Sequence, residues 1–276
     1  WTGFAYLGEA GPWPRKGLEI SFFDFAGFKT PRGHFYECLW KDEPKVYMVT
    51  TPADESEYSF HPETGWQFKQ REYAIPSMKW LRRWEWDLVY EKWNYKPDER
   101  IIVQAYTNCE ESELFLNGKS LGRKKLSDFN DHIMKWLTDY QEGELEIVGY
   151  NNGQEADRYK LKSQKPLDSI LIHTTRKSMA ANHYDVVIVD LTLLDGSGTL
   201  LTDQDQKVTF EYEGDASLLG VDNGWEMNVQ DHHSNEIVTH NGRALVVFQA
   251  NGKKTVLKLI ARSGELKSNE LTIGIN

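Results

Sequence analysis

Residues 113–122 read Glu-Leu-Phe-Leu-Asn-Gly-Lys-Ser-Leu-Gly, and this stretch decides the fold class. A period of two in hydrophobicity runs on both sides of Asn117-Gly118, a dipeptide in which two consecutive residues readily take positive φ. That combination predicts a β-hairpin. Further Asn-Gly pairs predict four more hairpins, and they begin at residues 152, 223, 241 and 251. The chain is therefore expected to be mainly β.

The residues around these turns predict two β units in tandem. Residues 144–150 turn at the second Asn-Gly pair into residues 155–161, which indicates a meander within one sheet system. A short polar linker, Ser163 to Pro166, separates this unit from the next. We expect an immunoglobulin-like β-sandwich over residues 45–164 and a second one over residues 165–276.

Alternating apolar residues give the core faces of the second unit. In a strand, side chains two residues apart point to the same side of the sheet. Four sets of such residues are predicted to face the core: Val187, Val189, Leu191 and Leu193; Val208, Phe210 and Tyr212; Leu257 and Leu259; and Leu271, Ile273 and Ile275.

Residues 1–44 differ in composition and in predicted secondary structure from the rest of the chain. An apolar strand at residues 1–10 runs into a Gly/Pro-rich loop, residues 22–28 are densely aromatic, and Arg32 to Lys41 is predicted to be a helix after Pro31. Strand, long loop and helix form one βα unit. Because the chain starts without Met and inside a strand, we expect it to be a piece of a longer protein.

Residues 54–91 do not fit the sandwich pattern and are expected to form a long insertion or a hairpin. Trp84, Trp86 and Leu88 alternate with charged residues, as in a half-buried strand. The two tryptophans are a candidate carbohydrate platform, because aromatic faces stack on the C–H faces of sugar rings. Tryptophans that cover a sandwich edge are the preferred interpretation.

Composition excludes several classes of function. The net charge of −10 argues against nucleic acid as a partner, because phosphate binding needs clustered cations. No apolar run approaches the roughly 20 residues that span a bilayer, so no membrane partner is expected. The aromatic content of 13% fits large cores or sugar binding. Cys38 and Cys109 lie in segments assigned to different domains, so both are expected to be buried free thiols.

The sequence offers no evident catalytic carboxylate pair. Glycoside hydrolysis generally uses two Asp or Glu side chains. Asn-Glu dipeptides occur at Asn235-Glu236 and Asn269-Glu270, but both lie in the second β unit beside polar turns, and we interpret them as coincidence.

Cofactor and metal sites are likewise not predicted. His232 and His233 would point to opposite faces of a strand, and the pair Asp203 and Asp205 lacks the glycine and distal glutamate of a calcium loop. Gly196-Ser-Gly198 opens no helix and is predicted to be a turn.

Several motifs together resemble the C-terminal part of a bacterial glycoside hydrolase of family 2, the β-galactosidase and β-glucuronidase group. The resemblance covers nearly the whole chain, and residues 113–122 are its most specific motif. The others, in chain order, are Trp1-Thr-Gly-Phe-Ala-Tyr-Leu-Gly-Glu-Ala10, Phe25-Ala-Gly-Phe28, Ala105-Tyr-Thr-Asn-Cys109 and Leu218-Leu-Gly-Val-Asp-Asn-Gly224.

The resemblance implies that residues 1–44 are the eighth strand and last helix of a TIM barrel, followed by two accessory immunoglobulin-like sandwiches. It implies a parent that is a retaining exo-glycosidase acting on β-galactosides, whose catalytic glutamates lie upstream, so that none is in this chain. Trp1 would line the sugar subsite, and the carbohydrate substrate would bind through the missing barrel. Ala5 stands where relatives often have an acidic residue, and this leaves β-glucuronides or other β-glycosides open.

The accessory region is expected to buttress the barrel or to form subunit contacts in a homo-oligomer. Two other roles are weighed: a carbohydrate-binding module, suggested by the Trp-rich insertion, and an adhesin or spacer array, against which the βα unit speaks. The resemblance also suggests a periplasmic or secreted protein. If residues 1–44 lack the rest of their barrel, we expect them to pack on the first sandwich, to pair with a neighbouring chain or to be mobile.

Overall fold

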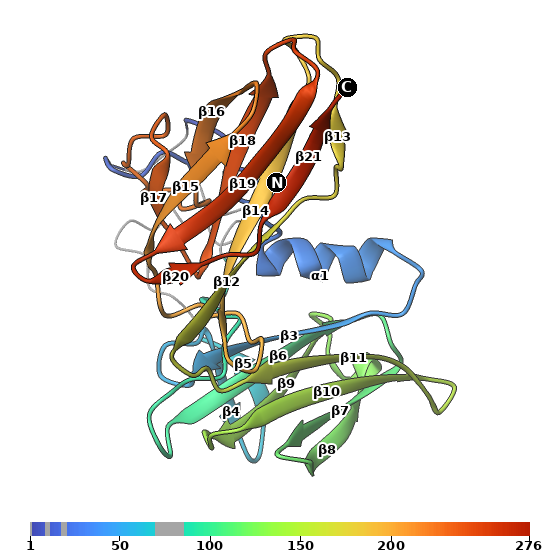
Figure 1. The fold of residues 1–276 in the computed structure, drawn as a ribbon. Helices are drawn as coiled ribbons and strands as arrows, with labels where there is room; N and C mark the ends of the chain where they lie inside the picture. Colours follow the sequence, from blue (N-terminus) through green and yellow to red (C-terminus); the bar gives the residue numbers. More distant parts are fainter. Residues whose placement is uncertain (1, 9–11, 18–20, 70–85) are drawn as a thin grey trace. The chain divides into compact units, whose positions relative to one another are not determined.

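The computed structural model describes residues 2–8, 12–17, 21–69 and 86–276 (Figure 1). Contacts divide the chain into two compact units. Of the described residues, 2–5, 21–23, 29–69 and 86–163 belong to the first unit. The second unit contains residues 6–8, 12–17, 24–28 and 164–276. The chain thus alternates between the units up to residue 29 and changes unit once more after Ser163.

Two antiparallel sheets form a sandwich in the first unit. One has the strand order β3-β6-β9 and the other β11-β10-β7-β8. The facing sides bury a shared core that includes Met48, Val103 and Met134 from the first sheet and Leu114 and Ile147 from the second. The strands are β3 (Val46–Pro52), β6 (Arg100–Thr107), β7 (Glu111–Leu116), β8 (Lys119–Lys125), β9 (Ile133–Asp139), β10 (Glu144–Asn151) and β11 (Gln154–Lys162). A 3-10 turn, Leu126–Asp128, follows β8.

The hairpin predictions hold where consecutive strands pair. Asn117 and Gly118 have φ of 51° and 77° and join β7 to β8; Asn152 and Gly153 have φ of 52° and 76° and join β10 to β11. Asn241 and Gly242, at 50° and 67°, form the tight turn His240–Arg243. Three of the five pairs therefore adopt the double positive-φ turn.

The predicted hairpins at Asn223-Gly224 and Asn251-Gly252 are wrong. Each glycine has positive φ, but the asparagine before it does not. Asn223 instead uses its side chain to accept from the Trp225 amide and to donate to the Val238 carbonyl. Asn251 precedes a strand of the other sheet, so no hairpin can close there.

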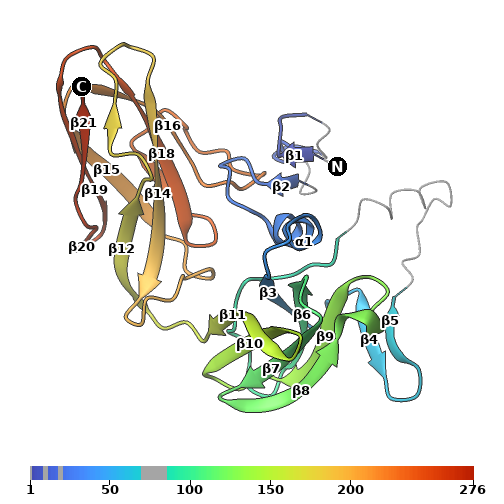
Figure 2. The ribbon, with the colours of Figure 1, turned by 90° about the vertical axis from the view of Figure 1, so that its right-hand side faces the viewer.

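The sheet β3-β6-β9 is buried on both faces. All seven residues of β3 are buried, although only alternate ones face the sandwich core. The outer face carries Tyr47, Val49 and Tyr106, which pack with Phe35 and Cys38. These last two residues belong to helix α1 (Pro31–Trp40), which Figure 2 shows lying over this sheet. The helix thus takes the place of solvent on one side of the sheet.

Helix α1 follows a pair of short parallel strands, β1 (Thr2–Phe4) and β2 (Ser21–Phe23). Pro31 occupies the first turn, where its missing N–H costs nothing, and the Thr30 hydroxyl accepts the Gly33 amide at 3.1 Å. The helix predicted after Pro31 is confirmed, within one residue at each end. Its assignment to a TIM barrel remains a prediction.

The insertion contains a short hairpin, β4 (Tyr58–His61) with β5 (Gly65–Phe68). The strand predicted through Trp86 and Leu88 is wrong for the described part, because residues 86–89 belong to no strand. Their polar groups are used elsewhere: the Asp87 carboxylate accepts from the Glu57 amide at 2.7 Å, and the Leu88 carbonyl accepts from the Thr51 hydroxyl at 2.7 Å.

The second unit is also a sandwich, of the sheets β12-β14-β18-β16 and β13-β21-β19-β15-β17, with β20 paired to β19. The predicted core face of β14 is confirmed, since its four residues are all 0% exposed. Tyr212 was wrongly placed in the core; it is 39% exposed and packs its ring edge-on against Phe248 at the rim. The strands are β12 (Leu167–His173), β13 (Ser178–Met179), β14 (Val186–Asp195), β15 (Lys207–Glu213), β16 (Ala216–Asp222), β17 (Glu236–Val238), β18 (Arg243–Ala250), β19 (Thr255–Ser263), β20 (Leu266–Lys267) and β21 (Leu271–Ile275).

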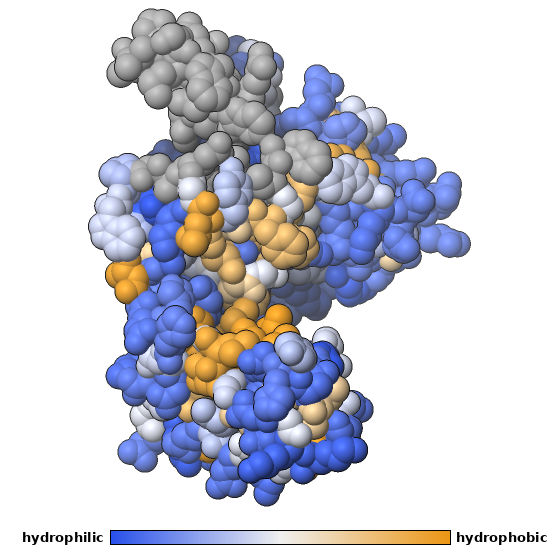
Figure 3. Space-filling model, turned by 90° about the horizontal axis from the view of Figure 1, so that it is seen from above, coloured by the Kyte–Doolittle hydropathy of each residue, from blue (hydrophilic) through white to orange (hydrophobic). Residues whose placement is uncertain are grey.

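Hydrophilic side chains dominate the face shown in Figure 3, and hydrophobic ones gather over a limited area of it. None of the helices among the described residues is long and apolar enough to cross a membrane. Cys38 and Cys109 are free and buried, as predicted. Both belong to the first compact unit.

Candidate functional site

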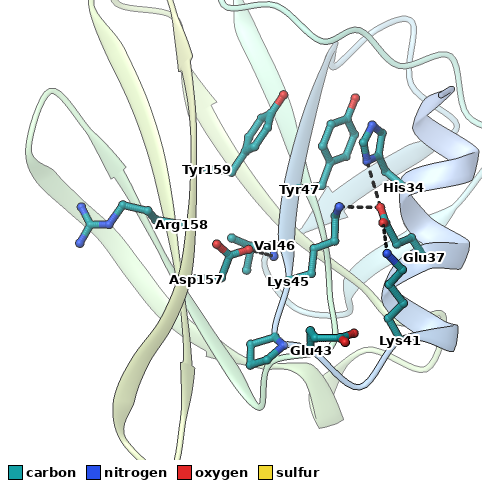
Figure 4. A pocket seen from close by; sticks show the side chains of 11 residues that line it. His34, Glu37, Lys41, Glu43, Lys45, Val46, Tyr47, Asp157, Arg158 and Tyr159 are labelled. Carbon is teal, nitrogen blue, oxygen red and sulfur yellow. Dashed lines mark hydrogen bonds and ion pairs between the residues drawn. The ribbon is translucent and has the colours of Figure 1, made fainter. Parts of the chain in front are cut away.

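A pocket of about 400 Å³ lies between helix α1 and the first sandwich. Figure 4 shows that His34, Glu37 and Lys41 reach it from the helix, Lys45 from the start of β3, and Tyr159 from β11. All of these residues belong to the first unit. The pocket therefore gathers ionisable groups at the junction of the βα unit and the sandwich.

Glu37 is the centre of an ion-pair cluster, which we define as Glu37 with Lys29, Lys41 and Lys45. Its carboxylate oxygens lie 2.8, 3.0 and 2.5 Å from the three ammonium nitrogens. Burial acts to raise the pKa of Glu37, but the hydrogen bonds from the lysines outweigh it and hold that pKa well below its usual range. A carboxylate that stays ionised in this way is a poor proton donor at neutral pH.

His34 adds a neutral aromatic contact to the cluster. Its ring stacks on Tyr47, with centroids 3.9 Å apart and planes within 13°. Burial lowers the pKa of His34 to about 4, so the imidazole carries no charge at pH 7. Nδ1 of the ring lies 3.6 Å from the Glu37 carboxylate. The pocket is built to hold the helix on the sheet rather than to transfer protons.

Glu37 and Lys41 are separated by one helical turn, so this pair has a sequence signal. Sequence reasoning nevertheless missed the cluster, because nothing in the sequence indicates that Lys29 and Lys45, from loops on either side of the helix, converge on the same carboxylate. No signal in the sequence alone would have found them.

The insertion is fixed to the same outer face by buried polar groups. The Asp87 carboxylate accepts from the Ser56 hydroxyl at 2.9 Å and from the Gln104 side-chain amide. Burial raises the pKa of Asp87. On the next strand, the buried Lys135 ammonium donates to Asp131 at 2.6 Å and lies 4.1 Å from the centre of the Tyr58 ring. These contacts anchor the hairpin to the sheet.

The candidate carbohydrate residues are only partly described. Trp1 and Trp84 lie outside the described residues. Trp86 is half-buried: its indole packs against Phe35 at 5.2 Å and Tyr106 at 6.0 Å between ring centroids. The Arg32 guanidinium lies 5.2 Å from the Trp86 ring. The contacts of Trp86 are those of a side chain that covers a sheet.

The second unit has its own polar cluster, formed where residues 12–17 and 24–28 meet the sandwich. The Asp24 carboxylate accepts the amides of Ala26 and Phe28, each at 2.9 Å. Burial raises the pKa of Asp24 to about 6, against these two hydrogen bonds. His232 accepts a hydrogen bond from the Lys16 ammonium at 3.3 Å. The backbone amide of Lys16 donates to the Glu226 carbonyl at 2.9 Å.

The two Asn-Glu dipeptides have local structural roles. Glu236 binds Lys207 at 2.7 Å on an exposed strand pair, and hydrogen bonds from Lys207 and Thr209 lower its pKa. Asn269 uses its side-chain amide to bridge the backbone N–H and carbonyl of Ile172. Within the described ranges, no group of three or more His, Cys, Asp or Glu residues could hold a metal ion.

Comparison with known proteins identifies the family. Residues 170–272 match the glycoside hydrolase family 2 C-terminal domain 5, and residues 98–157 match a domain of unknown function, DUF4982. The chain is 27% identical over 277 residues to the β-galactosidase BoGH2A of Bacteroides ovatus, covering 99% of this chain and 28% of that protein.

Two further relatives agree. A protein of Formosa agariphila that is named as a candidate β-glucuronidase is 29% identical over 230 residues, or 81% of this chain and 18% of that protein. The crystal structure of a glycosyl hydrolase family 2 member from Bacteroides cellulosilyticus superposes with a TM-score of 0.85 at 26% identity, covering all of this chain and 35% of that one.

The chain thus spans between about a fifth and a third of the length of these relatives. The relative from Bacteroides ovatus and the superposed structure each cover almost all of the chain, and the family 2 domain match covers residues 170–272. The chain belongs to glycoside hydrolase family 2.

Proposed function

We propose that the chain is the C-terminal accessory region of a retaining exo-glycosidase that hydrolyses β-galactosides, and that its role is to support the catalytic barrel. In this proposal residues 1–44 are the last strand and helix of the barrel, and residues 45–164 and 165–276 are immunoglobulin-like sandwiches. The match of almost the entire chain to a β-galactosidase supports the substrate.

The observation that carries the supporting role is the covered outer face of the sheet β3-β6-β9. Helix α1 contributes Phe35 and Cys38 to a closed hydrophobic cluster with Tyr47, Val49 and Tyr106. The ion-pair cluster around Glu37 closes the edge of that contact. A helix held through both apolar packing and charge would give the barrel a rigid attachment to the sandwich.

The catalytic step is assigned to residues outside this chain. A retaining glycosidase places a nucleophile and an acid/base carboxyl about 5 Å apart and passes through a covalent glycosyl intermediate. The clustered carboxylates described here are held by lysines or by backbone amides, as Glu37 and Asp24 are. Trp1 is assigned to the sugar subsite because the family resemblance implies that role for it.

Hydrolysis of chromogenic glycosides tests this proposal. The purified chain should release no nitrophenol from aryl β-galactosides, whereas the longer protein that contains it should. Turnover by this chain alone would contradict the accessory role. In the longer protein, Phe35→Ala should lower the temperature of inactivation while leaving kcat/KM at 25 °C within about twofold, because the contact supports the barrel and does not touch the substrate.

β-Glucuronides are the second candidate substrates, favoured by the relative named as a candidate β-glucuronidase. A glucuronide carries a carboxylate that a galactoside lacks, so its subsite needs a cation. Parallel assays of the longer protein on aryl β-galactosides and β-glucuronides decide between them. A carbohydrate-binding module ranks lower, because Phe35 and Arg32 already lie against Trp86. Retardation of the chain in affinity electrophoresis against galactans would reverse that ranking.

A further inference from the structure

Trp13 is a strongly exposed aromatic residue on the connection between β1 and β2. Its side chain is 76% exposed, and Leu7 on the same connection is 72% exposed. A tryptophan ring this exposed presents a large, rigid apolar face to solvent, and such a face can stack on the C–H face of a sugar ring. The connection leaves the C-terminal end of a strand that belongs to a parallel pair. In a barrel, that end of the strand faces the substrate.

Arg15 and Lys16, which closely follow Trp13 in the sequence, bind to the second sandwich. The Lys16 amide donates to the Glu226 carbonyl at 2.9 Å, and the Gly8 amide donates to the Lys16 carbonyl at 3.0 Å. The Arg15 guanidinium lies 3.8 Å from the Glu226 carboxylate, whose side chain is only 8% exposed. Backbone and side chain of one residue of the sandwich therefore set the course of this segment.

His232 of the second sandwich forms a further hydrogen bond with this segment. The Lys16 ammonium can only donate, so Nε2 of the ring accepts at 3.3 Å, and Nδ1 must carry the proton that it donates to the Val221 carbonyl at 2.9 Å. A Cβ on Gly17 would lie 2.5 Å from the Phe25 ring and 2.6 Å from the Tyr6 carbonyl. Lys16 and Gly17 are thus closely packed.

We propose that Trp13 is a stacking platform for the sugar on the leaving-group side of the scissile bond, and that Glu226 of the second sandwich is its positioning residue. The inference rests on the proposed glycosidase function and goes beyond it, because it gives the second sandwich a part in substrate selection. The substrates it selects are β-glycosides whose leaving group is itself a pyranose ring. The face of the indole would cover the C–H face of that ring.

The test compares two substrates in the longer protein that contains this chain. One is a β-linked disaccharide and the other a β-glycosyl fluoride of the same sugar, whose leaving group has no ring to stack. Trp13→Ala should lower kcat/KM for the disaccharide about tenfold, mainly through KM, and leave the fluoride within about twofold. Trp13→Tyr, which keeps an aromatic face, should recover most of the loss.

Glu226→Gln should lower kcat/KM for the disaccharide about threefold, in the same direction. Combined with Trp13→Ala, it should add nothing, because a residue that acts through Trp13 has no effect once the ring is gone. Tyr184→Ala is the matched control: Tyr184 is 83% exposed in the same unit and should leave both substrates unchanged.

The outcomes separate the inference from the function on which it rests. A wild-type protein that hydrolyses neither substrate contradicts the proposed function. An active wild type in which Trp13→Ala changes both substrates equally, or neither, overturns the platform. Additive losses in the double variant overturn the positioning role of Glu226. If Trp13→Ala does not fold, Trp13→Tyr and Trp13→Leu are compared instead. The ratio of kcat/KM for the disaccharide to kcat/KM for the fluoride in these two variants gives the same decision.

Discussion

Strands β3 and β14 belong to sandwich sheets that differ in the number of buried faces. In β3, Val-Tyr-Met-Val-Thr-Thr-Pro, every residue is buried. In β14, Val-Val-Ile-Val-Asp-Leu-Thr-Leu-Leu-Asp, buried residues alternate with exposed or half-buried ones. The sheet that contains β14 has one interior face, as is usual for an antiparallel sheet. The sheet that contains β3 has two, because helix α1 and the insertion cover its outer side.

The outer face of the sheet β3-β6-β9 is where the two units differ most. An outer sheet face normally gains stability only from cross-strand pairs and remains open to water. On the outer face of β3-β6-β9, Tyr47 and Tyr106 are 2% and 0% exposed, whereas Ile188 on β14 is 52% exposed. The first sandwich is therefore shaped to hold a helix.

The largest expected effect concerns the ring of Tyr106 beneath the helix. Tyr106→Ala should lower the free energy of unfolding by about 3–5 kcal/mol, as for a large buried aromatic. Ile188→Ala, on the open face of β14, should cost less than about 1 kcal/mol. Chemical denaturation of the chain measures both. Tyr106→Phe, which keeps the ring, is the control, and equal costs for the two alanine variants would remove the distinction between the sheets.

The ion-pair cluster should contribute next. Glu37→Gln should lower the free energy of unfolding by about 1–3 kcal/mol at pH 7, because three lysines would then face one another around a half-buried site. Glu211→Gln, which breaks the exposed pair with Arg262 at 2.9 Å, should cost less than about 1 kcal/mol.

The pH dependence of the Glu37 effect has a definite sign. Because the pKa of Glu37 is lower in the folded chain than the ordinary 4.5, its contribution is present above that pH and is lost as the pH falls below it. The difference in unfolding free energy between Glu37→Gln and the wild type should therefore shrink below pH 4.5. A difference that grows on acidification would contradict the assignment.

Asp24 of the second unit should behave in the opposite way. Its pKa rises from 3.8 to about 6 on folding, so the folded chain binds more protons and the unfolding free energy falls as the pH rises through this range. Asp24→Asn keeps an oxygen to accept both backbone amides. It should stabilise the chain by about 1–3 kcal/mol at pH 8 and by little near pH 4. Denaturation at the two pH values measures this, and destabilisation at pH 8 would refute it.

The smallest expected effect on the free energy of unfolding concerns the asparagines of two Asn-Gly pairs, Asn117 and Asn251. Asn117 has a φ of 51°, and its side chain both accepts the Glu144 amide at 2.9 Å and donates to the Glu142 carbonyl at 3.0 Å. Asn117→Ala should cost about 1–2 kcal/mol through strain and lost hydrogen bonds. Asn251 lacks the positive φ, so Asn251→Ala should cost less than about 1 kcal/mol by the same denaturation assay. The reverse order would contradict the turn assignments.

Local patterns predicted much of the fold, and non-local contacts account for the rest. The core face of β14 and the hairpins at Asn117 and Asn152 depend on residues close in sequence, so periodicity and turn chemistry suffice. The strand expected through Trp86 failed because Asp87 bonds to residues 17 and 31 positions away. Such long-range partners carry no mark in a single sequence.

In the candidate site, too, only the contacts between residues close in sequence could be predicted. The Glu37–Lys41 pair follows from helical spacing, but the convergence of Lys29 and Lys45 depends on how the helix packs on the sheet. The prediction of a carbohydrate platform at Trp84 and Trp86 rested only on their being aromatic residues. Whether a tryptophan covers a sheet, as Trp86 does, or faces water, as Trp13 does, is decided by tertiary packing.

Thiol labelling of the two cysteines tests most directly the claim that the first sandwich holds helix α1. Cys38 lies on the helix and is 3% exposed; Cys109 lies in the sandwich core and is 0% exposed. Burial raises the pKa of both thiols, that of Cys38 to about 12. In Cys109→Ala and Cys38→Ala, each remaining thiol can be labelled alone under native conditions.

If the helix is an integral part of the unit, Cys38 should react at least about a thousandfold more slowly than in the unfolded chain, with a denaturant dependence close to that of Cys109. Labelling of Cys38 within a few-fold of the unfolded rate, while Cys109 stays protected, would show that the helix is not held by the sandwich and would contradict the account.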